Sequence, residues 1–188
     1  MKAYISPSTQ GHNITALGNT EENIMHKIAD ALMPMLVGID ALRGQKTDSL
    51  AQMVRESNLF NADIHVAIHS NAHDSKSRGC EVFHYPNSKD GKRLAESIYK
   101  YIEPLTPTAD RGIKTSNSYY ELKETDAPAV IVEVDFHDTY EGAKWIDDNI
   151  YNIAEAIAKG ICEYLGVSFK EDKYKAAIEQ IKRIVTNL

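Results

Sequence analysis

Two residues, His69 and Glu133, could do chemistry because of where they lie. His69 ends an alternating apolar stretch in the string AIHSNA, and Glu133 lies inside the apolar string VIVEVDFHD. A carboxylate in such a run costs free energy unless it is paired or bound to something. Imidazole and carboxylate groups also bind metals and carry protons. Two structural explanations stay open: a Glu133 salt-bridged to a neighbouring helix, and a His69 that is only a satisfied strand-end histidine.

A second histidine, His65, lies four residues before His69. Two helical histidines at this spacing can share one zinc ion. The alternation here indicates a strand, in which four residues span roughly 13 Å, so the two rings cannot bind the same ion. His69 lies nearer the carboxyl end of the strand. We therefore take His69 as the candidate ligand and His65 as structural.

Strands and helices alternate along the chain. Apolar alternation or β-branched runs predict strands over residues 2–5, 63–69, 80–85 and 129–136. Helical spacing predicts helices over residues 21–35, 50–60, 89–105 and 150–164, with Thr20 as the first N-cap and Gly166 as the last C-cap. This pattern predicts a single-domain α/β fold with a mainly parallel, twisted sheet flanked by helices. Ligands bind such sheets at the carboxyl ends of the strands.

Several segments, in this order, resemble one known family. TEENIMHKIADAL resembles the family's helix opening EKxLNLxIAxxL, AIHSNA resembles SIHAN, and DAPAVIVEVDFHD resembles PAVLVEVGF; GCEVFHYP and TADRGIK resemble the segments that follow SIHAN. The family is that of the zinc-dependent N-acetylmuramoyl-L-alanine amidases of the third amidase class. The resemblance covers roughly residues 3–167. It implies zinc-activated hydrolysis of the amide bond between N-acetylmuramic acid and L-alanine in peptidoglycan, with Zn2+ as cofactor.

The resemblance assigns roles residue by residue. His69 takes the role of a zinc ligand and Glu133 that of the catalytic glutamate. Aligning Ile28-Ala29 with the family's Ile-Ala pair makes Glu21 the second ligand. Two histidines and one glutamate would leave an open position on the metal for water and substrate.

Two further residues are candidates for binding the substrate oxyanion, Asn71 and His137. The alternatives are that Asn71 shapes a turn and that His137 orients Glu133 or has no role in the reaction.

The first motif departs from the family. Where the family has DPGHGG, this chain has ISPSTQGHN, which puts Thr9 at the histidine position. The SPSTQ string resembles the phage endolysin and clostridial branch. The nearest imidazole is His12, which we take as the third ligand. The alternatives are His26 or an incomplete site. His26 follows Glu21 by five residues, about 500° around a helix, so it should point away.

Composition narrows the classes of function. The chain has 188 residues, 43% of them hydrophobic, and a formal net charge of −6. It can bury a core without staples, and we expect no binding to nucleic acid or to a membrane. Cys80 and Cys162 lack CxxC spacing and should be free buried thiols. No signal peptide is visible, so we expect synthesis in the cytoplasm and action on the wall after release, as an endolysin or a mother-cell autolysin.

The predicted domain boundary follows Gly166. Residues 1–167 form the predicted catalytic domain, and residues 168–188 form an amphipathic helix. Its apolar seam is Tyr174, Ile178, Ile181, Val185 and Leu188. This helix could fold back on the domain, form a homodimer or begin a linker to a wall-binding module. Two other functions stay open: a non-catalytic peptidoglycan-binding module with a decayed metal site, and a metallopeptidase acting on the stem peptide.

Overall fold

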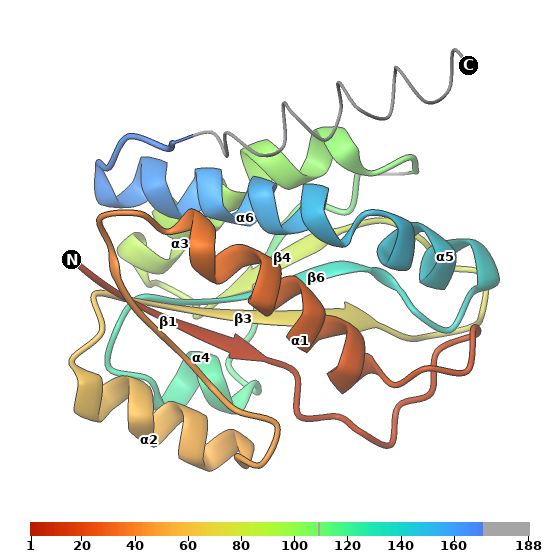
Figure 1. The fold of residues 1–188 in the computed structure, drawn as a ribbon, viewed down its shortest axis with the longest axis horizontal. Helices are drawn as coiled ribbons and strands as arrows, with labels where there is room; N and C mark the ends of the chain where they lie inside the picture. Colours follow the sequence, from red (N-terminus) through yellow and green to blue (C-terminus); the bar gives the residue numbers. More distant parts are fainter. Residues whose placement is uncertain (109, 171–188) are drawn as a thin grey trace, which may run out of the picture.

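The computed structural model describes residues 1–108 and 110–170, which form one six-stranded sheet with helices on both faces (Figure 1). The strands are β1 (Lys2–Pro7), β2 (Asp40–Arg43), β3 (Ile64–Asn71), β4 (Glu81–His84), β5 (Ile113–Thr115) and β6 (Ala129–Phe136). Their order is β2-β1-β3-β6-β4-β5. Every neighbouring pair is parallel except β4 and β6. The predicted mainly parallel α/β sheet is therefore confirmed.

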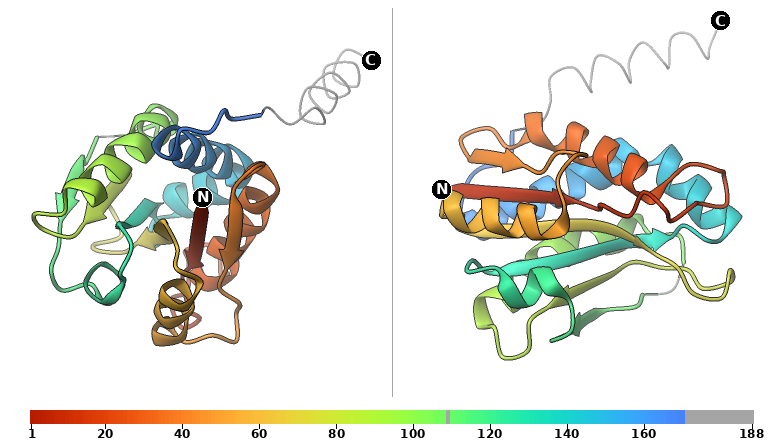
Figure 2. Two further views of the ribbon diagram at one scale, coloured as in Figure 1. Left: turned by 90° about the vertical axis from the view of Figure 1, so that its left-hand side faces the viewer. Right: turned by 90° about the horizontal axis from the view of Figure 1, so that it is seen from below.

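The helices cover the two faces of the sheet unequally. They are α1 (Glu21–Leu32), α2 (Leu50–Phe60), α3 (Lys89–Ile102), α4 (Tyr120–Glu124), α5 (Tyr140–Asp148) and α6 (Ile150–Leu165), with the short 3₁₀ helices η1 (Met33–Met35) and η2 (Glu103–Leu105). In Figure 1, α1, α3 and α6 lie above the sheet, whereas α2 and α4 lie below it. The two views of Figure 2 show the same two layers. The α2/α4 face is thus the more lightly covered one.

Alternation along β3 and β6 sends successive side chains to the two layers. The even-numbered residues join the large core with α1, α3 and α6; they include Ile64, Val66, Ile68, Val130, Val132 and Val134. Among the odd-numbered residues, Ala67, Ala129 and Ile131 pack with Leu122 of α4 in a smaller cluster. Because the period of a strand is two, the odd-numbered His65, His69 and Glu133 also belong to the α4 face.

Local signals set the ends of the elements near the strand termini. The Thr20 side chain accepts a hydrogen bond from the Asn23 amide and caps α1, as predicted, which makes Glu21 the first helical residue. Gly166 ends α6 in the left-handed region with φ 69°, also as predicted. At Gly142 a Cβ would lie 2.0 Å from the Phe136 carbonyl oxygen, so only glycine lets α5 start this close to the end of β6.

Four elements were not predicted: β2, β5, α4 and α5. β2 and β5 are the edge strands of the sheet and have three or four residues each. Neither contains a buried residue, so their sequences lack the apolar run that marks a central strand. α4 has five residues, too few to show a helical period.

The end of the described chain belongs to the fold. Val167 and Phe169 pack against the large core, so the packing continues to residue 169 among the described residues. Residues 171–188, which hold the predicted apolar seam, lie outside the described residues. Cys80 and Cys162 are free and buried, as predicted. Within residues 1–108 and 110–170, no helix combines the length and apolarity needed to cross a membrane.

Candidate active site

The carboxyl ends of β3 and β6 and the first turn of α1 bring three of the predicted residues together. His69 on β3 and Glu133 on β6 are register partners on adjacent strands. His69 Nδ1 lies 3.0 Å from Glu21 Oε1. The backbone amide of Ser70 donates to the same Glu21 oxygen at 3.3 Å. The side-chain amide of Asn13 donates to the other Glu21 oxygen at 2.8 Å. Glu21 is completely buried, so its charge depends on these partners.

A fourth residue, Glu121 of α4, joins this group. Its Oε2 lies 3.6 Å from His69 Nε2, and its Oε1 lies 3.1 Å from His65 Nε2. The Ser6 hydroxyl also donates to Oε1. The Glu121 carboxylate therefore links His65 to His69. The ring of Tyr4 stacks on the ring of His65, with 5.4 Å between their centroids. The site is a buried chain from His65 through Glu121 and His69 to Glu21.

Sequence reasoning did not identify Glu121. The available signal was that His65 and His69 point to the same face of one strand, because they are an even number of residues apart. Two imidazoles on a buried face need a polar partner from the element that covers them. That element is α4, where Glu121 precedes the buried Leu122.

The carboxylates of Glu21 and Glu121 stabilise a positive charge on the His69 ring that lies between them. Burial alone would lower the pKa of His69, but its hydrogen bonds to Glu121 and Glu21 raise the pKa well above its usual value. Burial would raise the pKa of Glu21 and of Glu121, but their bonds to histidine lower both. Without a metal, a protonated His69 ring thus supplies the positive charge that Glu21 and Glu121 require.

Glu133 has the opposite electrostatic environment. Burial raises its pKa to about 7, and its Oε2 is buried with no hydrogen-bond partner. Glu81 faces it across the antiparallel β4–β6 pair, and like charges in opposite positions repel. Glu81 is paired with Arg111 at 2.9 Å and with Lys114. Glu133 is left as the carboxyl group that can take up and release a proton near neutral pH.

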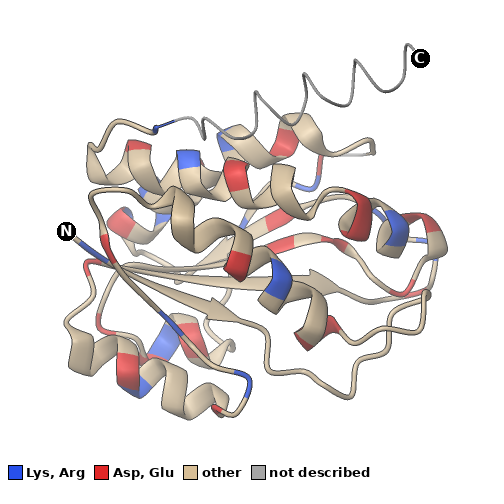
Figure 3. Ribbon diagram, viewed as in Figure 1, with Lys and Arg blue, Asp and Glu red and all other residues tan. Residues whose placement is uncertain are grey.

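Other acidic residues also lie on the strands of the sheet. In the view of Figure 3, acidic and basic residues both occur along the helices, and acidic positions also occur within the strands. Among the latter is the buried Asp135 of β6, bound by Arg78 at 2.8 Å and by the Gly79 amide at 2.8 Å. Of these strand carboxylates, Glu133 is the one with a buried unpartnered oxygen among the residues described.

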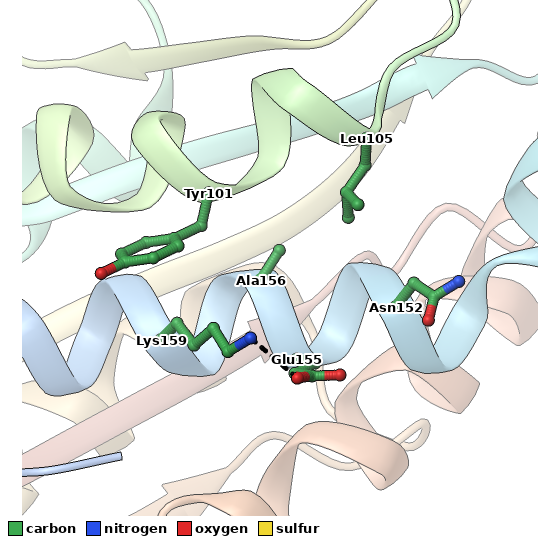
Figure 4. Close-up of a pocket in the computed structure, with 6 residues that line it drawn as sticks. All are labelled: Tyr101, Leu105, Asn152, Glu155, Ala156 and Lys159. Atoms are coloured by element: carbon green, nitrogen blue, oxygen red, sulfur yellow. Dashed lines mark ion pairs between the residues drawn. The ribbon is translucent and has the colours of Figure 1, made fainter. Parts of the chain in front are cut away.

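A pocket of about 120 Å³ opens beside the site on the α4 face. Its lining residues are Gln10, Leu50, His69, Tyr119, Tyr120, Glu121, Ile131 and Glu133. A second pocket lies between α3 and α6 (Figure 4) and is lined by Tyr101, Leu105, Asn152, Glu155, Ala156 and Lys159. It contains the Lys159–Glu155 ion pair at 2.8 Å but none of the strand-end residues. The pocket on the α4 face is therefore the candidate active site.

Comparison with known proteins decides the family. Residues 4–163 match the profile of the N-acetylmuramoyl-L-alanine amidase family. The chain belongs to this family. The catalytic domain of the amidase CwlV from Bacillus (Paenibacillus) polymyxa var. colistinus superposes with a TM-score of 0.80 at 26% identity, covering 89% of this chain and 100% of that domain. The amidase fold implied by the sequence resemblance is thus confirmed.

Curated relatives of this amidase-family chain are longer proteins. An uncharacterized cell wall amidase of Bacillus anthracis is 35% identical over 63% of this chain and 24% of its own length. The amidase LytC of Bacillus subtilis is 31% identical over 86% of this chain and 35% of its own length. The chain therefore spans about a quarter to a third of these two relatives.

The first motif, which departs from the family, does not bring His12 to the site. His12 is exposed in a turn, and within the described residues no hydrogen bond or ion pair joins its ring to Glu21 or His69. Two amide side chains of the same loop do reach the site: Gln10 Nε2 lies 3.4 Å from His69 Nδ1, and Asn13 binds Glu21. Sequence reasoning did not consider either amide.

The other predicted candidates have partners elsewhere. His26 is buried and its Nδ1 lies 3.0 Å from the Arg43 guanidinium, so its ring does not face Glu21. Burial, together with Arg43, lowers the pKa of His26 to about 4. Asn71 donates to Glu81 at 2.7 Å and accepts the Ala72 amide at 2.9 Å. The ring of His137 contacts Ser70 through Nδ1, at 2.9 Å from the hydroxyl and 3.0 Å from the carbonyl oxygen.

The site residues of this amidase-family domain fit a metal ion in part. No three His, Cys, Asp or Glu side chains within residues 1–108 and 110–170 form a group that could hold one. Two of the expected donors are in place, because the 3.0 Å between His69 Nδ1 and Glu21 Oε1 is close to the ~3.3 Å between two ligands of a tetrahedral zinc. The unpartnered Glu133 oxygen and the surplus of buried carboxylates also favour a cation.

Glu133 should make the metal-free protein less stable as pH rises. In the folded state its pKa of about 7 exceeds the usual glutamate value of 4.5, so between these pH values the folded state keeps a proton that the unfolded state loses. The unfolding free energy should fall by about 1.4 kcal/mol per pH unit over this window. Glu133→Gln cannot titrate. Urea unfolding in chelator should show the unfolding free energy of the variant rising relative to that of the wild type between pH 5 and pH 8. A difference that does not depend on pH would contradict the assignment.

Proposed function

We propose that this chain is a zinc-dependent amidase that hydrolyses the bond between N-acetylmuramic acid and L-alanine in peptidoglycan. The observation that carries the proposal is the buried Glu133 beside the His69–Glu21 pair, at the strand ends of a domain of this family. LytC and CwlV bear the name of that activity, and the chain covers the whole of the CwlV catalytic domain.

His69 Nδ1 and Glu21 would hold the zinc. His12, the third ligand expected from the sequence, is exposed in a turn and would have to move to join them. Bound zinc supplies a Lewis acid for the attacking water and for the substrate carbonyl. Glu121 has a supporting role: it binds the Nε2 side of His69, which leaves Nδ1 free to face the metal. Glu21 is in turn held by the Ser70 amide.

Glu133 would move the proton. Its Oε2 takes a proton from the attacking water and passes it to the nitrogen of the leaving L-alanine. A group does both halves of this transfer well when its pKa lies near the working pH, and burial raises the pKa of Glu133 to about 7. The apolar wall of the pocket at Ile131 and Leu50 keeps the carboxyl group from bulk water.

The substrate would bind in the pocket on the α4 face. Tyr119 and Tyr120 line it, and their side chains are 38% and 45% exposed, so their rings can pack against a sugar or an apolar part of the stem. Asn71 and His137 were suggested for the oxyanion; they would have to give up their bonds to Glu81 and Ser70 to act there.

Digestion of purified peptidoglycan tests the proposal. The expected products are whole glycan strands and intact stem peptides with free L-alanine amino termini, identified by mass spectrometry. Cleavage within the stem would show a metallopeptidase instead. Binding to the wall without any new amino terminus would show a non-catalytic module. The place of action would be the cell wall, after release from the cell that makes the enzyme.

Shortening the chain tests the domain boundary and a homodimer formed through residues 171–188, one of the alternatives that the sequence leaves open. Val167 and Phe169 pack on the core, and Lys159 lies over the Phe169 ring at 5.4 Å from its centroid. A chain ending at Lys170 should therefore fold and cleave peptidoglycan, whereas one ending at Leu165 should lose thermal stability. Light scattering should show a dimer for the full chain and a monomer for the chain ending at Lys170. Monomers in both cases would refute the homodimer. If the chain ending at Lys170 did not fold, the residues after it would belong to the catalytic domain.

A further inference from the structure

The loop after β1 places an amide, not an imidazole, beside the His69–Glu21 pair. Gln10 Nε2 lies 3.4 Å from His69 Nδ1, whereas His12 is exposed two residues later. We propose that the side-chain carbonyl of Gln10 is the third protein ligand of the metal, in place of a histidine. This inference rests on the proposed zinc site and names one of its ligands.

The metal-free contacts at His69 Nδ1 are mutually incompatible. Glu21 Oε1, at 3.0 Å, requires a hydrogen on Nδ1. The Gln10 amide nitrogen, at 3.4 Å, brings hydrogens of its own and requires a lone pair there. A ring nitrogen has either the hydrogen or the lone pair, so it cannot satisfy both neighbours. With the Gln10 amide in this orientation, one of the two contacts at His69 Nδ1 is therefore left unsatisfied.

Turning the Gln10 amide over resolves this conflict when a cation is present. The oxygen and nitrogen of a carboxamide have nearly the same shape, and exchanging them costs only the hydrogen bonds involved. The carbonyl oxygen of Gln10, the lone pair of His69 Nδ1 and Glu21 Oε1 would then converge as three donors. Their present spacings of 3.4 Å and 3.0 Å are near the ~3.3 Å between the ligands of a tetrahedral ion.

The loop backbone holds Gln10 in this position. The Ser8 amide continues the pairing of β1 with β3 by donating to the Ile68 carbonyl at 3.0 Å. The Gln10 amide then donates to the Ser8 hydroxyl at 3.1 Å, and the Asn13 amide donates to the Gln10 carbonyl at 3.2 Å. The Asn13 side chain bridges Gln10 Oε1 at 2.6 Å and Glu21 Oε2 at 2.8 Å. Turning the Gln10 side-chain amide breaks the bond between Asn13 and Gln10 Oε1 and keeps the bond between Asn13 and Glu21 Oε2.

A carboxamide ligand preserves the charge of the site but changes its preference for metals. Gln10 is neutral, as a histidine ligand would be, so Glu21 remains the one anionic ligand. Amide carbonyl oxygen is a harder donor than imidazole nitrogen and is better suited to Mn²⁺ or Mg²⁺. Replacing Gln10 with histidine should therefore tighten zinc binding and increase the preference for zinc over manganese.

Counting imidazoles on the bound metal tests the ligand without measuring activity. X-ray absorption at the zinc edge of the full chain loaded with one zinc should show a single imidazole, that of His69. The Gln10→His variant should show two. A wild-type spectrum with two imidazoles, one of which disappears in His12→Ala, would overturn the proposal and leave the zinc enzyme intact.

Zinc titration of matched loop variants gives a second measurement. Gln10→Ala should lower the zinc affinity by on the order of tenfold or more, and His12→Ala should leave it unchanged. Circular dichroism in chelator verifies that both variants are folded, since neither change creates a cavity in the core. An unchanged affinity in Gln10→Ala would overturn the Gln10 ligand alone. A wild-type chain that binds no zinc would overturn the proposed function as well.

Discussion

Replacing Glu133 with glutamine should lower turnover by on the order of 10²–10⁴ while zinc remains bound. Glutamine keeps the size of the side chain but cannot accept a proton from the attacking water. The proposed metal donors His69 and Glu21 do not depend on Glu133, because their contacts run through Nδ1 and Oε1 to each other. Release of L-alanine amino termini from purified peptidoglycan measures the turnover, and metal analysis measures the bound zinc.

Asp135→Asn is a matched control for this variant. Asp135 lies two residues further along β6 and is also buried, but Arg78 and the Gly79 amide bind its carboxylate. Its amide variant should lose stability, because a partly buried guanidinium loses its counter-charge. It should keep most of its turnover at a temperature where it is folded. If Glu133→Gln also keeps wild-type turnover, Glu133 has a structural role and the mechanism is wrong.

The central part of the fold could be predicted from the sequence because its strands are buried on both faces. The run 129–136 is almost continuously apolar and forms β6, in which every residue is buried. The edge strands β2 and β5 could not be predicted, because hydrogen bonds to one neighbour hold them and they have little apolar content. Hydrogen bonding of the backbone leaves no mark on residue type.

Some of the site residues on helices and strands could also be predicted from the sequence, whereas those on the loop after β1 could not. Glu21, His69 and Glu133 lie on regular elements, so their motifs also fix where their side chains point. The angular argument that excluded His26 rests on helix geometry, and His26 indeed faces Arg43. The loop between β1 and α1 has no such regularity. Counting residues from Pro7 could identify an imidazole nearby, but it could not show that the turn directs it to solvent.

Glu121 marks a different limit of sequence reasoning. Its contacts with His65 and His69 join residues 56 and 52 positions apart in the chain. α4 packs mainly against β6, and β6 lies beside β3 in the sheet, so the strand order brings Glu121 to the two histidines. The sequence pattern does not reveal that order. A buried carboxylate such as Glu121, which contacts both histidines, is therefore found only when the packing of distant elements is known.

His69→Ala should abolish both metal binding and wall lysis. Removing the ring takes away one proposed metal ligand. It also removes the positive charge between Glu21 and Glu121, and alanine can neither hold a proton nor bind a metal there. In the wild type, a chelator should stop lysis, and added zinc should restore it. Zinc at a hundred times its Kd should also raise the unfolding free energy by about 2.7 kcal/mol. In His69→Ala, zinc should change neither quantity.

His84→Ala provides the matched control, because His84 is also a buried histidine at the end of a strand. Its Nδ1 faces the Tyr85 carbonyl at 2.9 Å, and within the described residues no hydrogen bond or ion pair joins its ring to the site. This variant should still be stabilised by zinc and should lyse the wall. Lysis by His69→Ala in the presence of chelator would show that the reaction needs no metal at this site. Zinc stabilisation lost equally in both variants would show that the effect comes from general damage to the sheet and not from the loss of a ligand.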